Sequence, residues 1–182
     1  MKLCKPYKSC TPQKMTQGFN PQHRANDWAG SYGEDLVAPF NGKVASIITA
    51  ENIDTGEELL YGYGIRIISA EDPSFYLSYW HCLPFFGVDV GDYVNMGQPI
   101  AEMGNSGFVF SGGKYVDIDI RTIPPYPGTH AHISCGKKND DGSYTEMDYS
   151  TLIDWSIPIN YDAKTFIWAI LKKIMNFLKG RK

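Results

Sequence analysis

The sequence has no excess of positive charge and no secretory signal. Its net charge is -3 at pH 7, so no overall basic field is available to attract nucleic acid. The first residues, "MKLCKPYKSC", carry charge but precede no apolar run of the kind that a secretory signal needs. We therefore expect no nucleic-acid partner and no signal-directed export.

Cysteine is scarce and irregularly spaced. The chain has four cysteines, Cys4, Cys10, Cys82 and Cys135, and none of them forms a C-x-x-C pair. This spacing argues against a thiolate zinc site and against a disulfide framework. Free thiols are the expectation, and a Cys4–Cys10 bridge in an oxidising compartment is the alternative.

Alternating apolar and polar residues between glycines predict short strands. The 182 residues suffice for one domain with its own core, and 12 tyrosines and 18 glycines favour strands and turns. The segments "GKVASIITA", "GIRIIS" and "FYLSYWH" alternate as half-buried strands do. In the third segment, one face is predicted to hold Phe75, Leu77, Tyr79 and His81. These patterns favour an all-β fold.

Only the C-terminal segment has helical periodicity. Within residues 161–182, apolar side chains recur at helical spacing with lysines between them. Its apolar run is shorter than the roughly 20 residues that cross a bilayer. We predict a basic amphipathic helix that packs on the domain or on a second copy, with docking on a membrane surface or another protein as the alternative.

The chain has only four histidines, and their settings are distinctive. His130 and His132 alternate within "GTHAHISC", so they should share one strand face about 7 Å apart. His23 precedes Asp27 by four residues, and an imidazole and a carboxylate at this separation can bind one zinc ion. Three protein ligands would leave an open position, as in a catalytic zinc site. His81 ends a predicted strand and by itself suggests a hydrogen-bonded core residue.

Five ordered sequence blocks together resemble one enzyme family. The blocks are "HRANDWAGSYGEDLVAPFNGKV", "GYG", "SYWHCL", "VDVGDYVNMGQPIAEMGNSG" and "GTHAH", over about residues 17 to 135. In this order they resemble the lysostaphin-like (LytM-type) zinc metallopeptidases of family M23, which cut peptides in bacterial cell walls. The resemblance implies an antiparallel β-sandwich or groove of the duplicated hybrid motif type. One small departure is Ala25, where the family has glycine.

The resemblance also implies a division of labour among the histidines. The family's ligands for a single zinc ion correspond to His23, Asp27 and His132, the second histidine of the H-x-H pair. The family's general base and stabilisers of the tetrahedral intermediate correspond to His81 and His130. The sequence leaves open which of these two takes which role.

The expected organisation is one domain with short appendages. We predict an N-terminal arm at residues 1–16, a metallopeptidase domain at 17–160 and the helix at 161–182. Residues 108–127 form an insertion relative to the family, which we expect to be a hairpin that walls the substrate groove. In "KYVDIDIRT" the alternation predicts a strand, with Asp117 and Asp119 on a solvated face rather than at a second metal site.

The predicted activity is zinc-dependent hydrolysis of amide bonds in peptidoglycan stem or cross-bridge peptides. Glycine or D-alanine is expected at the cleaved bond by resemblance. Without a signal, the protein would be made in the cytoplasm and then act at the bacterial cell wall, as a phage lysin released by other proteins or as a virion-associated enzyme. The alternative is a catalytically silent cell-wall-binding or virion structural module on the same fold.

Overall fold

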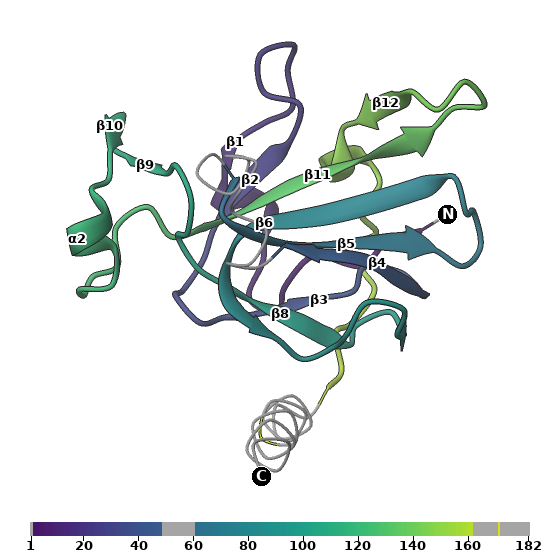
Figure 1. Ribbon diagram of the computed structural model, residues 1–182, viewed down its shortest axis with the longest axis horizontal. Coiled ribbons are helices and arrows are strands. Elements are labelled where there is room, and N and C mark those ends of the chain that lie inside the picture. The colour runs from purple at the N-terminus through teal and green to yellow at the C-terminus, as the bar shows by residue number, and fades with distance from the viewer. Residues whose placement is uncertain (1, 49–60, 162–170, 172–182) are drawn as a thin grey trace, which may run out of the picture.

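An antiparallel sheet is the main element of the described chain, residues 2–48, 61–161 and 171 of a computed structural model (Figure 1). The main path of this 10-stranded sheet runs β1 (Met15–Gln17), β2 (Asn26–Ala29), β11 (His130–Lys138), β6 (Phe75–Phe86), β5 (Tyr63–Ser69), β4 (Gly42–Ile48) and β7 (Tyr93–Val94). Off this path, β12 (Tyr144–Met147) pairs with β11, while β8 (Pro99–Met103) pairs with β6 and with β3 (Asp35–Val37). A separate ribbon joins β9 (Phe110–Ser111) to β10 (Lys114–Tyr115), and the helical elements are η1 (Pro12–Lys14), α2 (Ile118–Arg121) and η3 (Tyr149–Thr151).

One face of the central strands forms the core, because alternate side chains of a strand point to the same side. β3 and β8 contribute to this core from beside the central strands (Figure 1). Burial of each large aliphatic side chain contributes about 1.5–3 kcal/mol to folding. The fully or almost fully buried side chains of these strands include Leu36, Ile65, Ile67, Leu77, Tyr79, Ile100 and Ile133.

The N-terminal residues pack into the same core. Leu3 and Tyr7 are fully buried, and the Tyr7 hydroxyl donates to the carbonyl of Ala29 at 2.6 Å. The Tyr149 hydroxyl donates to the carbonyl of Cys4 at 2.8 Å. All four cysteines are free and buried in this structure.

Most of the predicted C-terminal helix lies outside the described residues, namely 162–170 and 172–182. That helix therefore stays a prediction. Among the described residues, no helix has the length and apolar character needed to cross a membrane.

β6 breaks its alternation just before the site, and this corrects the predicted orientation of His81. Tyr79 pairs with Ile65 and Cys82 pairs with Tyr63, so β6 has one more residue than β5 between these two pairs. The extra residue forms a bulge, and His81 adopts the left-handed φ of 58°. Tyr79 therefore stays in the core while His81 turns into the groove on the other side. Such a backbone costs about 1–3 kcal/mol and is typical of functional sites.

Residues 108–127 project from one end of the sheet (Figure 1). The ribbon β9–β10 supplies a short hairpin, but the predicted strand alternation over residues 116–121 is wrong because α2 begins at Ile118. The Asp117 side chain caps this helix by accepting from the amide of Asp119. The helical turn directs Arg121 inward, where only 7% of the residue is exposed.

Arg121 holds the insertion together through its guanidinium. It donates to the carbonyls of Gly107 and Val116 and to the Tyr115 hydroxyl. Asn105 ties this cluster to the sheet end by donating to the carbonyls of Arg121 and Pro127, both at 2.9 Å. The insertion is therefore anchored from within.

Replacing Arg121 by methionine is expected to destabilise the insertion. The variant keeps the apolar stem but leaves buried carbonyls without a donor, which costs about 2–4 kcal/mol. Hydrogen exchange of amides in 108–127, compared with those of β5 and β6, measures whether opening is local or global. Arg24→Met is the control, because the Arg24 side chain is 56% exposed. Equal exchange in the two variants would contradict the anchoring role.

Candidate metal and catalytic site

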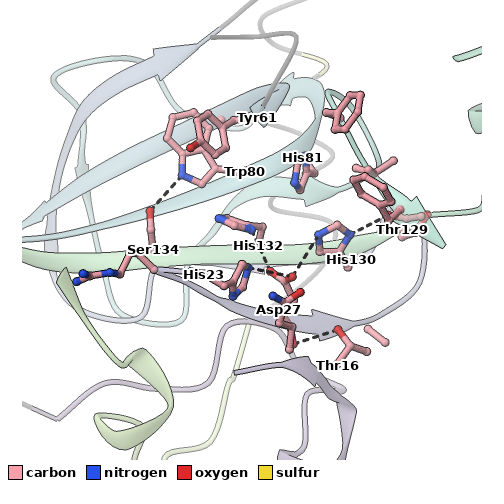
Figure 2. A pocket seen from close by; sticks show the side chains of 18 of the residues that line it. Thr16, His23, Asp27, Tyr61, Trp80, His81, Thr129, His130, His132 and Ser134 are labelled. Carbon is pink, nitrogen blue, oxygen red and sulfur yellow. Dashed lines mark hydrogen bonds and ion pairs between the residues drawn. The ribbon is translucent and has the colours of Figure 1, made fainter. Parts of the chain in front are cut away.

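The candidate site lies in a groove over the outer face of the central strands. The groove has a volume of about 1240 Å³ and is lined by residues of β2, β4, β5, β6 and β11, with parts of the insertion at one end. All four histidines and Asp27 line it. Figure 2 shows His23, His130 and His132 arranged around Asp27, with His81 beside His130.

The pairing of β11 with β2 brings Asp27, His130 and His132 together. β11 pairs with β2 so that His132 lies directly opposite Asp27 and His130 lies opposite Ala29. His23 comes from the loop before β2, where its amide donates to Oδ1 of Asn20 at 3.0 Å. The rings of His130 and His132 share a face with centroids 6.5 Å apart, close to the spacing predicted for the H-x-H pair.

Asp27 lies at the centre of a possible metal-binding trio. Its Oδ2 is 3.2 Å from Nε2 of His23, and its Oδ1 is 3.0 Å from Nδ1 of His132. Ligand atoms of these three residues all lie within 4.8 Å of one another. Two imidazoles and a carboxylate match the ligand chemistry of zinc.

Unpaired polar atoms in the trio also suit a cation. Within the described residues, Oδ1 of Asp27 is buried and accepts no hydrogen bond with proper geometry despite its proximity to His132. Nδ1 of His23 lies 3.4 Å from the carbonyl of Gly18. Because a carbonyl can only accept, this contact favours a proton on Nδ1, and the lone pair of Nε2 then points at Asp27. Two acceptors facing each other need a proton or a metal ion between them, so these residues fit a metal.

Asp27 carries its negative charge at neutral pH. Burial acts to raise its pKa, but the contact with His132 and the nearby His130 and His23 outweigh burial and leave the pKa of Asp27 lowered. A buried anion among imidazoles attracts a divalent cation.

His81, His130 and His132 form a second trio of possible ligands. This trio contains no carboxylate, and Nδ1 of the shared His132 lies beside Asp27. His81 has Nδ1 at 2.7 Å from the carbonyl of Ser106, and His130 has Nδ1 at 2.8 Å from the carbonyl of Gly128. The charge and the shared ring nitrogen therefore favour the Asp27 trio as the metal site.

Both remaining histidines are neutral near pH 7. Burial, together with the nearby His130 and His132, lowers the pKa of His81 to about 3. Burial also lowers the pKa of His130, against the opposing charge of Asp27. With Nδ1 of each donating to a backbone carbonyl, Nε2 of each is the acceptor. The site thus holds two neutral imidazoles whose rings lie 4.7 Å apart.

Sequence reasoning missed Ser106, which positions His81. Besides its carbonyl contact to His81, Ser106 donates from Oγ to the carbonyl of Cys82 at 2.7 Å and accepts from the amide of Tyr63 at 2.9 Å. The block "GNSG", which contains Ser106, was the signal in the sequence that could have pointed to it.

Asp117 and Asp119 lie in the insertion, and neither joins a metal-binding group among the described residues.

A carboxylate and several imidazoles in an open groove on an antiparallel sheet are typical of a metal-dependent hydrolase. The model of peptidase family M23 matches residues 21–132, and the chain belongs to that family. This confirms the lysostaphin-like resemblance and the antiparallel β fold predicted from the sequence. A comparison with curated protein sequences finds no match.

Solved structures share the fold at low sequence identity. The structure of LytU is 24% identical with a TM-score of 0.54, covering 79% of this chain and 86% of that one. The catalytic domain of the antimicrobial peptidase lysostaphin from Staphylococcus simulans is 21% identical with a TM-score of 0.54, covering 76% and 90%. A zinc containing peptidase from Vibrio cholerae is 19% identical with a TM-score of 0.57, covering 86% of this chain and 41% of that chain.

Proposed function

We propose that the protein is a zinc-dependent endopeptidase that hydrolyses amide bonds in peptidoglycan stem or cross-bridge peptides. The observation that carries this proposal is the cluster of Asp27, His23 and His132 beside two neutral histidines in one groove. Membership of family M23 and the wall-lytic relatives in the sequence resemblance support the substrate class.

His23, Asp27 and His132 are the proposed ligands of one zinc ion. Bound zinc would supply Lewis acidity, polarising a carbonyl and lowering the pKa of a water molecule. The Gly18 carbonyl next to Nδ1 of His23 orients that ring, as outer-shell partners of ligating histidines do. The open groove leaves room for substrate beside the trio.

His81 and His130 are the proposed proton-handling residues. Each has one nitrogen at a backbone carbonyl and the other free to accept a proton from water. Once protonated, the same imidazole can donate to the leaving amine or stabilise a negative oxygen. Because the rings are 4.7 Å apart, a proton on one disfavours a second on the other. The pair therefore holds one proton at a time, which matches a reaction that takes one proton from water and donates it to the leaving amine.

The insertion is proposed to wall one end of the groove. Phe108 and Phe110 line the groove and remain 45% and 53% exposed, and Phe108 stacks on Tyr115 at 4.5 Å. An extended peptide reaching the histidines from that end would contact these rings.

Residues 17–160 are proposed as the catalytic domain. Phage origin, virion association, delivery to the wall by other proteins and docking through 161–182 stay predictions.

Digestion of purified peptidoglycans tests the activity. Zinc-loaded protein is incubated with walls of several cross-bridge chemistries, and released fragments are identified by mass spectrometry. New peptide termini that disappear with a chelator, and return when zinc is added back, are expected. The absence of new termini from every wall would favour the silent wall-binding or structural module, which a pull-down on the same walls would detect.

A further inference from the structure

Two neighbouring rows of residues cross the groove floor. His132 of β11 lies opposite Trp80 of β6 in the first row. In the next row Ser134 of β11 lies opposite Ser78 of β6, and Ser78 lies opposite Arg66 of β5. The second row therefore places a cation among small hydroxyl side chains, two positions along the strands from His132.

Arg66 is fixed in this row by neighbours on the same face. Its Nε donates to Oγ of Ser78 at 2.9 Å. Its guanidinium lies over the Tyr76 ring at 4.7 Å and near the Tyr144 ring at 5.8 Å. Stacking on aromatic faces holds the planar fork in one orientation, which reduces the entropy lost when an anion binds.

The charge of Arg66 is not matched within the described residues. Two arginines line the groove, and Arg24 has Oε2 of Glu146 at 3.8 Å. By contrast, no described carboxylate lies within 4.0 Å of Arg66, and its Nη atoms make no hydrogen bond to a described residue. A planar cation with free, oriented donors on the groove floor suits a carboxylate bound through two parallel hydrogen bonds.

The spacing from the histidines fixes where such a carboxylate would sit. Arg66 is two residues along the strands and two strands across the sheet from His132. These offsets are about 7 Å along the strands and about 10 Å across them, so the two residues lie about 12 Å apart. An extended peptide spans this distance in about three to four residues at roughly 3.3 Å each.

We propose that Arg66 forms a substrate subsite that binds a peptide carboxylate three to four residues from the cleaved bond. The proposal rests on the proposed endopeptidase function and adds a specificity determinant to it. Arg66 would set the register of the peptide in the groove, so substrates with an amide at that position would bind less tightly.

Cleavage mapping tests the register. Blocked glycine peptides carry a single Glu at each position in turn, with Gln counterparts, and a second set carries a free C-terminal carboxylate or its amide. Mass spectrometry of products from zinc-loaded protein is expected to show the cut moving with the carboxylate at a constant spacing. With Gln or amide peptides, or with Arg66→Gln, cuts are expected to spread over several bonds. Cuts that ignore the carboxylate would overturn the proposal.

Calorimetric binding separates this proposal from the hydrolysis proposal. In zinc-loaded protein carrying His130→Ala, Glu peptides are expected to bind about tenfold more tightly than Gln peptides. Adding Arg66→Gln should remove this preference, whereas Lys43→Gln, an equal charge change on β4 at a residue that does not line the groove, should keep it. If peptides bind in an Arg66-dependent way but the unmodified chain cleaves none of them, the hydrolysis proposal is rejected and the carboxylate subsite stands.

A purely structural role for Arg66 predicts a different result. The melting temperature of Arg66→Gln would fall, and Glu and Gln peptides would lose affinity equally, which would overturn the proposal. If Arg66→Gln does not fold, Arg66→Lys keeps the charge but loses the fork, and it is expected to weaken the Glu preference in part. An unchanged preference in Arg66→Lys would then reject the two-bond contact.

Discussion

Asp27→Asn is expected to lose zinc and with it all peptide hydrolysis. The carboxylate faces Nε2 of His23 and Nδ1 of His132 at 3.2 and 3.0 Å, so it supplies the only negative charge of the proposed metal trio. An amide of the same size keeps the packing but removes that charge. Since outer-shell changes alone cost metal sites about 10–100-fold in affinity, loss of this ligand should cost more than about 100-fold.

Competitive titration with a chromophoric chelator measures this loss directly. Asp117→Asn is the matched control, because Asp117 caps α2 and asparagine caps a helix equally well. The control is expected to retain both zinc and activity. Retention of stoichiometric zinc by Asp27→Asn, or loss of zinc in Asp117→Asn, would refute the assignment of the ligands.

His130→Ala and His81→Asn are expected to keep zinc but lower kcat by about 10²–10⁴-fold each. Neither side chain lies in the Asp27 trio, and each presents one ring nitrogen to the groove as a proton acceptor. Asparagine is the better substitution for His81, because its backbone has a φ of 58° and asparagine adopts this conformation more readily than alanine.

Steady-state kinetics on one defined peptide, combined with zinc content by mass spectrometry, separates the two candidate trios. If the histidine-only trio held the metal, both variants would lose zinc together with activity. The double variant adds a further check. Residues that handle one shared proton act as a unit. The kcat of the double variant should therefore be only slightly lower than that of the less active single variant.

The sequence alone gave a correct family and fold because its signals are local. Glycine-bounded alternation predicts strands wherever one face is buried, as Ile65 and Ile67 of β5 illustrate. The ordered blocks around His23 and the H-x-H pair carried the resemblance that the family match later confirmed. Strand geometry also predicted that His130 and His132 share a face, because a period of two is a property of the backbone itself.

Local signals failed where contacts distant in sequence override them. The alternation of "FYLSYWH" assigned His81 to the core, but a bulge against β5 turned it into the groove. The alternation of "KYVDIDIRT" suggested a strand, but burial of Arg121 among the carbonyls of Gly107 and Val116 stabilises a helical turn.

The central strands, the family and the residue types able to bind a metal could be predicted from the sequence, because these depend on side-chain chemistry and backbone periodicity. Which groups meet depends on how the strands pair in three dimensions. The pairing of β11 with β2 sets His132 opposite Asp27, and the pairing of β6 with β5 sets Ser78 opposite Arg66. Strand register and bulges arise from packing between segments far apart in the chain, so no local pattern specifies them.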